Sequence, residues 1–145
     1  MNVCELNVVM EYTDWILVFG YGYMLNVVWE YLHFSLYITT YGPFPIIFLA
    51  SFVDAVSILF AFVVSSYVIS QSSSFSVVRM FLFVVLLLLL SYLYEMIGLS
   101  LGWWMYKDVM PVILGKGVSP LLQLSITGLA TVFLTHVTES LSSDD

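Results

Sequence analysis

The chain has 145 residues, of which 61% are hydrophobic and only 9% are charged, and its formal net charge is −7. Soluble domains carry about 25% charged residues, so this composition excludes an ordinary water-soluble domain and predicts one integral membrane domain over residues 1–145. The acidic balance, with three Lys and Arg residues in total, also excludes nucleic acid as a partner.

Four stretches of the chain are apolar enough to cross a bilayer, which takes about 20 residues for each helix. They cover residues 15–37, 44–69, 77–101 and 118–137, and acidic tails at 1–14 and 138–145 flank them. We therefore predict an all-α integral membrane protein with four transmembrane helices, multi-pass in the cell membrane. Its number of copies is left open, and a homo-oligomer is compatible with the sequence.

The segment between the third and fourth stretches, residues 102–117, is aromatic and apolar rather than polar. Trp and Tyr side chains prefer the headgroup zone of a bilayer, so we expect a short helix or a re-entrant cap that lies in the interface. Lys107 and Lys116 fall on this side of the membrane and Arg79 lies near the other. The positive-inside rule then places the Lys107 segment in the cytoplasm.

Three carboxylates interrupt the apolar stretches: Glu30, Asp54 and Glu95. At 1.5 Å per residue they lie roughly 10, 15 and 9 Å from the side that bears residues 102–117. Gln123 lies five residues into the fourth stretch from that same side. The sequence thus predicts one polar cluster in a single half of the membrane, with the other half of every helix nearly bare of polar groups.

Polar and aromatic residues accompany the first acid along its helix. Asn26, Glu30, His33 and Tyr37 are spaced four, three and four residues apart, which places them on one helical face, and Trp29 adjoins that face. In the third stretch, a further tyrosine, Tyr92, lies three residues before the acid. These neighbours are the hydrogen-bonding company that a buried acid needs.

The order of these residues resembles a family of small four-span prokaryotic membrane proteins of uncharacterised activity. The residues that carry the resemblance are Asn26-x-x-Trp29-Glu30, Leu36-Tyr37, Asp54, Glu95, Trp104-x-Tyr106, Met110-Pro111 and Ser119-Pro120-Leu121-Leu122-Gln123. The resemblance covers most of residues 24–125 and implies a four-helix membrane fold.

Two looser similarities bear on chemistry. The run Glu95-x-x-Gly98, with Gly102 and Tyr106 after it, is similar to carotenoid-biosynthesis membrane proteins. Four short helices with acids and tryptophans around one cavity are similar to membrane sterol isomerases and fungal-type terpene cyclases. Both similarities are analogies of fold and imply isoprenoid chemistry only as an expectation.

The acids have a functional and a structural interpretation. Burial in an apolar medium raises the pKa of a carboxyl group in general, and a neutral carboxylic acid can serve as a proton donor. As structural links between helices, polar contacts contribute only about 0.6–2 kcal/mol. Acids within membrane helices are functional by default, and we favour that interpretation.

A metal site is the alternative to this acid–base interpretation. The three acids and His33 are suitable ligand types, but the Glu-x-x-His spacing of di-metal helical bundles occurs only once, at Glu30 and His33. No metal and no cofactor are therefore predicted.

The preferred hypothesis is a membrane protein whose one-sided polar pocket binds or converts a lipid- or isoprenoid-like substrate. If it is an enzyme, isomerisation, cyclisation or hydration fits, because these reactions need only an acid and a shaped pocket. The alternatives are a small proton- or cation-coupled transporter, acting as an oligomer, and an accessory subunit of a membrane complex. The predicted catalytic residues are Glu30, Asp54 and Glu95, and the predicted substrate-binding residues are Asn26, Trp29, His33, Tyr92, Trp104, Tyr106 and Gln123.

Overall fold

The computed structural model describes residues 12–39, 43–69 and 76–142, and the predicted tails at 1–14 and 138–145 lie partly outside these ranges. Four long helices dominate it: α1 (Tyr12–His33), α2 (Pro43–Val68), α3 (Val77–Ser100) and α4 (Val118–Ser142). Three of them, α2, α3 and α4, are long and apolar enough to span a membrane, which supports a membrane protein. The first helix is not among these three, so the predicted fourth span stays a prediction.

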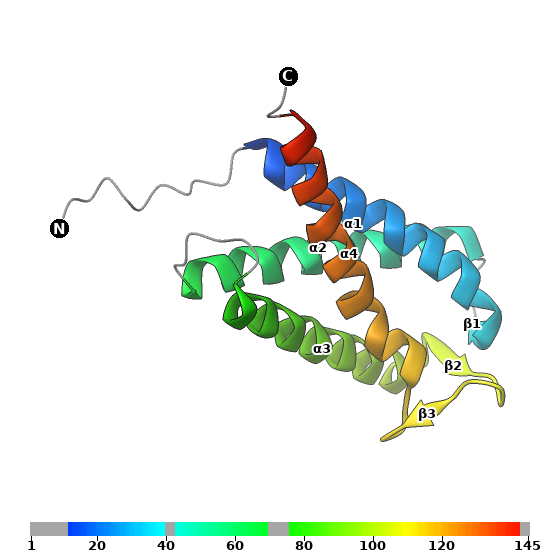
Figure 1. The fold of residues 1–145 in the computed structure, drawn as a ribbon. Helices are drawn as coiled ribbons and strands as arrows, with labels where there is room; N and C mark the ends of the chain where they lie inside the picture. The colour runs from blue at the N-terminus through cyan, green and yellow to red at the C-terminus, as the bar shows by residue number, and fades with distance from the viewer. Residues whose placement is uncertain (1–11, 40–42, 70–75, 143–145) are drawn as a thin grey trace.

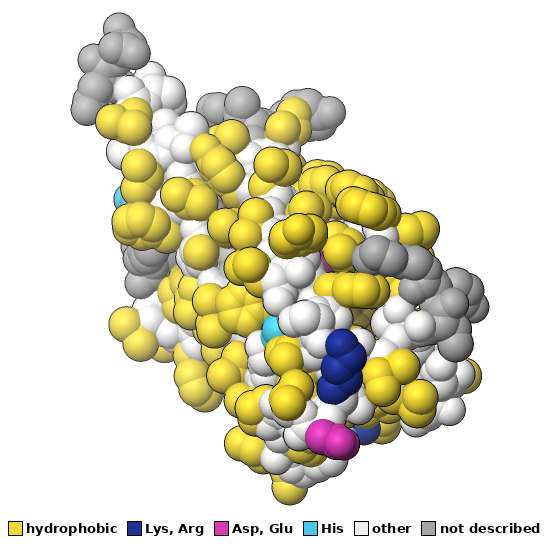
Figure 2. Space-filling view, turned by 90° about the vertical axis from the view of Figure 1, so that its right-hand side faces the viewer, with side chains coloured by type: hydrophobic (Ala, Val, Ile, Leu, Met, Phe, Trp, Pro, Cys, Tyr) yellow, Lys and Arg dark blue, Asp and Glu magenta, His cyan; other side chains and the backbone are white. Residues whose placement is uncertain are grey.

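The helices form a closed ring in which each packs against two neighbours. The first helix contacts α2 and α4, and α3 contacts the same two helices from the other side. Short strands gather at one end of this bundle, where α1 and α3 end and α4 begins (Figure 1). Figure 2 views the molecule from the right-hand side of Figure 1. Hydrophobic side chains cover most of this face, and a few charged side chains interrupt them.

The bundle core lies toward the end away from the strands. The Phe62 and Phe83 rings meet edge to face with 6.3 Å between their centroids. Gly128 of α4 permits the close approach of α3, since a Cβ there would lie 2.5 Å from Cδ1 of Leu87. Eight buried side chains make up this core: Val18, Ile58, Ala61, Phe62, Phe83, Leu87, Leu124 and Val132.

This half of the bundle is not bare of polar groups, and that prediction is wrong. Arg79, only 6% exposed, donates a hydrogen bond to the Ser66 hydroxyl, and its guanidinium carbon lies 4.8 Å from the centre of the Phe62 ring. Thr131 is buried and donates to the carbonyl of Thr127 in its own helix. Short hydroxyl side chains that bond to their own helix escape a hydropathy reading, because they need no partner from elsewhere in the chain.

The first helix ends earlier than the sequence predicts. After His33 the chain forms a 3-10 turn, η2 (Phe34–Leu36), and then a strand, β1 (Tyr37–Thr39). Tyr37 therefore does not continue the helical face that starts at Asn26.

Residues 102–117 form three short strands joined by turns and contain no helix, so the predicted short helix is wrong, whereas the alternative of a re-entrant cap in the interface stays a prediction. Strand β2 (Trp104–Tyr106) pairs antiparallel with β1, and places Tyr106 opposite Tyr37 and Trp104 opposite Thr39. Side chains alternate across a strand, so these four share one face of the pair. Strands β3 (Val112–Ile113) and β4 (Lys116–Gly117) form a second, two-residue pair that leads into α4.

Candidate functional site

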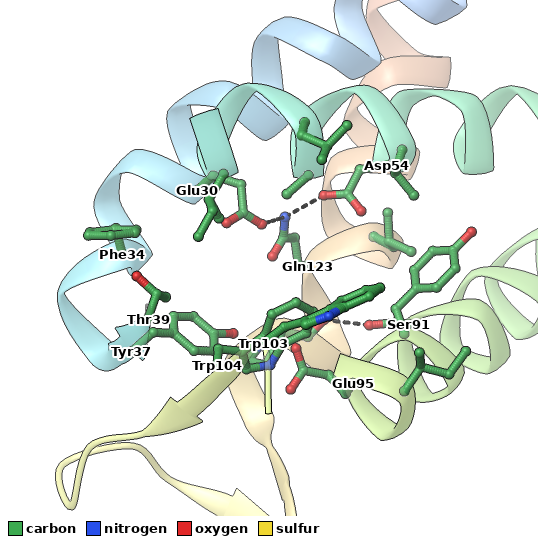
Figure 3. A pocket seen from close by; sticks show the side chains of 18 of the residues that line it. Glu30, Phe34, Tyr37, Thr39, Asp54, Ser91, Glu95, Trp103, Trp104 and Gln123 are labelled. Atoms are coloured by element: carbon green, nitrogen blue, oxygen red, sulfur yellow. Dashed lines mark hydrogen bonds between the residues drawn. The ribbon is translucent and has the colours of Figure 1, made fainter. Parts of the chain in front are cut away.

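The side-chain amide of Gln123 joins three helices. Its Nε2 atom lies 2.7 Å from Oε1 of Glu30 in α1, 2.8 Å from Oδ2 of Asp54 in α2 and 3.2 Å from Oδ1 of Asn26 in α1. Figure 3 shows Glu30 and Asp54 on either side of this amide. An amide NH2 group carries only two hydrogens, so three acceptors share two donated protons. Two carboxyl groups are thus held together by a single neutral donor.

A further layer of buried side chains holds this junction in place. Asn26 is fully buried and donates from Nδ2 to the carbonyl of Gly22 at 2.8 Å. Its Oδ1 faces the hydroxyl of Thr127 at 3.2 Å, and that hydroxyl lies 2.9 Å from the carbonyl of Gln123. Asn26 therefore positions the Gln123 amide.

The third acid stands apart from this junction, on α3. The hydroxyl of Tyr106 in β2 donates to Oε2 of Glu95, and the Trp104 indole of the same strand lies beside that acid (Figure 3). The indole is seated on Gly98 of α3, where a Cβ would lie 2.1 Å from its Cζ2 atom. Among the described residues, the buried Nε1 donor of Trp104 has no hydrogen-bond partner. The wall that α3 contributes to the site is therefore held by strand β2, which carries Tyr106 and Trp104, and by Gly98, which leaves room for the indole.

Two tyrosine hydroxyls from the strands face the acids. Desolvation by burial raises the pKa of the Tyr37 and Tyr106 hydroxyls above the ordinary value of 10.0. The hydrogen bond to Glu95 raises the pKa of Tyr106 further, and the charge of Glu95 raises that of Tyr37. Both hydroxyls therefore stay protonated near neutral pH and act as hydrogen-bond donors.

One cavity of about 600 Å³ connects the two groups of acids, a volume within the usual range of small-molecule sites. Five of its apolar lining residues are themselves exposed on the outer surface: Pro45, Leu49 and Val53 of α2, Ile97 of α3, and Trp103 after α3. Its mouth therefore lies between α2 and α3, beneath an apolar rim. Its lining comprises Glu30, Phe34, Tyr37, Thr39, Pro45, Ile46, Leu49, Ala50, Val53, Asp54, Ser91, Tyr94, Glu95, Ile97, Trp103, Trp104, Pro120, Gln123 and Leu124.

Half of the predicted site residues line this cavity, namely Glu30, Asp54, Glu95, Trp104 and Gln123. Two more support the lining from behind: Asn26 through the amide of Gln123 and Tyr106 through Glu95.

Three predicted substrate-binding residues are not part of the lining. Trp29 donates from Nε1 to Nδ1 of His33 at 3.0 Å, and the buried Nε2 of His33 has no hydrogen-bond partner among the described residues. Tyr92 is 40% exposed, and its ring lies 6.0 Å from the ammonium of Lys116. It therefore lies outside the cavity lining, although it is only three residues from Glu95 on α3.

Several lining residues were not predicted. Ser91 donates to the carbonyl of Pro120 at 2.5 Å and so links α3 to the start of α4. Phe34, Thr39 and Tyr94 complete the wall. The strand residues carry a signal in hindsight: Tyr37-x-Thr39 and Trp104-x-Tyr106 repeat with the period of two that extended strands have.

Among the described residues, no group of three or more His, Cys, Asp and Glu side chains is placed to hold a metal ion. No protein-family model, curated protein or solved structure matches the chain. The resemblance to four-span prokaryotic proteins therefore stays a prediction, and the site must be interpreted from its own geometry.

Proposed function

We propose that the chain is an integral membrane protein that binds a lipid- or isoprenoid-like molecule in the cavity and converts it by acid–base chemistry. The observation that carries the proposal is an apolar cavity of about 600 Å³ with three carboxyl groups on its walls. In this proposal α1 crosses the bilayer as a fourth span beside α2 and α4, with which it packs.

The position of the mouth favours a substrate that comes from the bilayer. Leu49, Val53 and Ile97 are exposed on α2 and α3, which are long and apolar enough to span a membrane. In a bilayer these side chains face lipid chains rather than water. A hydrophobic substrate could enter sideways between them without first crossing the aqueous phase.

The two groups of acids suit a reaction that moves a proton. In a double-bond isomerisation, one carboxylic acid protonates a carbon and a carboxylate removes a proton from another carbon, so nothing is gained or lost overall. Glu95 lies on the α3 wall, and the Glu30–Asp54 pair lies across the cavity on α1 and α2. This arrangement supplies one proton donor and one acceptor without a cofactor.

The test compares lipids extracted from cells that express the wild-type chain, Glu30→Gln, Asp54→Asn or Glu95→Gln. Asp108→Asn, at an exposed acid of the loop after β2, is the matched control. We expect the wild type and Asp108→Asn to change the lipid profile equally, and each cavity variant to lose the change. Identical profiles from all of these cells and from cells without the chain would exclude the enzymatic role.

A transport role is the second candidate, and one observation favours it. Gln123, Thr127, Thr131 and Thr135 are buried at four-residue intervals along α4, from the cavity toward the far end of the bundle. A proton flux into liposomes that Asp54→Asn abolishes and Asp108→Asn preserves would favour transport over catalysis.

A further inference from the structure

The charges around the cavity restrict the head group of its ligand. The lining contains three carboxyl groups and no Lys, Arg or His side chain. The whole sequence has only five such basic residues, and all of them lie within the described ranges, outside the lining: His33, Arg79, Lys107, Lys116 and His136. No basic side chain is therefore available to neutralise a phosphate or a carboxylate in this cavity.

The basic group that acts on the cavity acids does so from outside. Lys116 interacts with Glu95 electrostatically, but its ammonium lies over the ring of Tyr92, 6.0 Å from the centroid. At the far end of the bundle, Arg79 bonds to Ser66. An anionic head group would thus meet three acids without a counter-charge beside it, and burying such an uncompensated charge is strongly unfavourable.

Aromatic rings surround the same acids. Tyr37, Tyr94, Trp103 and Trp104 all line the cavity. The centroids of the two indoles lie 6.2 Å apart with their planes tilted by 52°, and Tyr37 meets Trp104 edge to face at 6.4 Å. Aromatic faces attract cations, and walls of several rings are the common means of holding an ammonium group. Carboxylates and aromatic faces together are the side chains that favour a positively charged ligand.

We infer that this cavity takes an amphiphile with a cationic, ammonium-type head, which lies against Glu95 and the indole of Trp104 while its apolar chain follows α2 toward the mouth. Phosphate-headed and carboxylate-headed lipids are excluded. The inference rests on the proposed function, because it names the substrate class of the same cavity.

The experiment measures binding of a head-group series with one alkyl chain to the full-length protein in a nonionic detergent. The ligands are dodecylamine, dodecyltrimethylammonium, dodecanol and dodecyl phosphate, and isothermal titration gives their affinities. Ala50→Phe, which fills the cavity from α2, measures binding to the micelle and the outer surface, and this background is subtracted. We expect the two ammonium ligands to bind at least roughly tenfold more tightly than dodecanol, and dodecyl phosphate not to bind above background.

Two substitutions test which side chain causes the preference for ammonium head groups. Glu95→Gln should reduce the affinity for the ammonium ligands by roughly tenfold and leave the affinity for dodecanol unchanged, whereas Asp108→Asn should change neither. The wild-type series decides the question even if Glu95→Gln fails to fold.

The possible failures are distinguishable. Dodecanol or dodecyl phosphate binding as tightly as the amines would overturn the cationic preference and leave the cavity a lipid site. Equal titrations of all four ligands with the wild type and with Ala50→Phe would overturn the proposed function itself.

Discussion

The two ends of the helix bundle differ in how their buried polar groups find partners. At the far end, hydroxyls such as those of Ser65, Thr131 and Thr138 donate to carbonyls three or four residues earlier in their own helices. At the strand end, Gln123 bonds to Glu30 and Asp54, which are 93 and 69 residues away in the chain. The local bonds satisfy hydroxyl groups within a single helix, whereas the long-range bonds hold two acids from different helices beside the cavity. Bonds between helices also occur at the far end, from Tyr21 to Thr138 and from Arg79 to Ser66, but only the strand end joins two acids through one shared donor among the described residues.

The largest expected effect comes from a substitution in the core at the far end of the bundle, at a residue that does not line the cavity. Phe83→Ala removes a ring from the packed core and should destabilise the protein by about 3 kcal/mol. Lipid conversion at temperatures below unfolding should persist. Unfolding in mixed micelles measures the loss, and Phe81→Ala, at a residue 70% exposed on the same helix, should cost less than about 0.5 kcal/mol. A cavity phenotype as severe as that of Glu95→Gln would show that the two ends are not separable.

Removal of the central amide should affect both stability and function. Gln123→Leu deprives Glu30 and Asp54 of their shared donor, and we expect a loss of about 2 kcal/mol together with loss of lipid conversion. Thr138→Val is the counterpart at the far end, where it removes the bond to Tyr21. It should cost about 1 kcal/mol with conversion unchanged. If Thr138→Val impairs conversion as much as Gln123→Leu does, the contrast between the ends is wrong.

Gly98→Ala tests the position of the Trp104 indole, which packs against Gly98 of α3. The new methyl group would overlap the ring, so the indole must move, at an expected cost of about 1–2 kcal/mol. Tryptophan fluorescence should shift as the ring leaves its site. Gly20→Ala is the matched control, because nothing lies within 4 Å of a Cβ there. It should be neutral or slightly stabilising, since Ala is the better helix former. An unchanged emission spectrum for Gly98→Ala would contradict this placement of Trp104.

Tyr106→Phe removes one donor and keeps the ring. Loss of the hydrogen bond to Glu95 should cost about 1 kcal/mol and slow lipid conversion. The same change at Tyr67, which is 87% exposed, should have no effect on unfolding or on the lipid profile. Equal stability of the two variants would mean that Glu95 does not depend on this hydroxyl.

The smallest expected effect is a loss of folding stability at alkaline pH. Burial raises the pKa of Tyr37 and Tyr106 above 10.0, so above about pH 10 the unfolded chain releases phenolic protons that the folded protein retains. Stability should therefore fall as the pH rises past that value. The fall should be shallower in Tyr37→Phe and in Tyr106→Phe than in the wild type. Midpoints of thermal unfolding measured across this range provide the comparison.

The sequence predicted the parts of the fold that depend on local hydropathy. The third predicted stretch, 77–101, differs by one residue from the helix Val77–Ser100, and 44–69 differs little from Pro43–Val68. Depth along these helices also predicted the meeting of Glu30, Asp54 and Gln123, because it requires only that the helices run side by side.

The features that the sequence did not predict depend on contacts between distant parts of the chain. The pairing of β1 with β2 joins residues that are more than 60 positions apart over only three residue pairs, too few for periodicity to reveal. Burial of Arg79 depends on the positions of Phe62 and Ser66 in another helix. The direction of Tyr92, similarly, follows from the rotation of α3 in the bundle, which its apolar sequence on all sides leaves undetermined.

The β1–β2 strand pair at the end of the bundle has a consequence for variation among related sequences. Main-chain bonds between β1 and β2, with one from Lys107 to Leu36, tie the end of α1 to the end of α3. The separation of the walls that carry Glu30 and Glu95 is therefore set by the backbone. Ile38 and Met105 point outward from this pair and are exposed, so they are free to diverge while the cavity keeps its width. An insertion of a single residue in either strand would instead reverse which side chains face the acids.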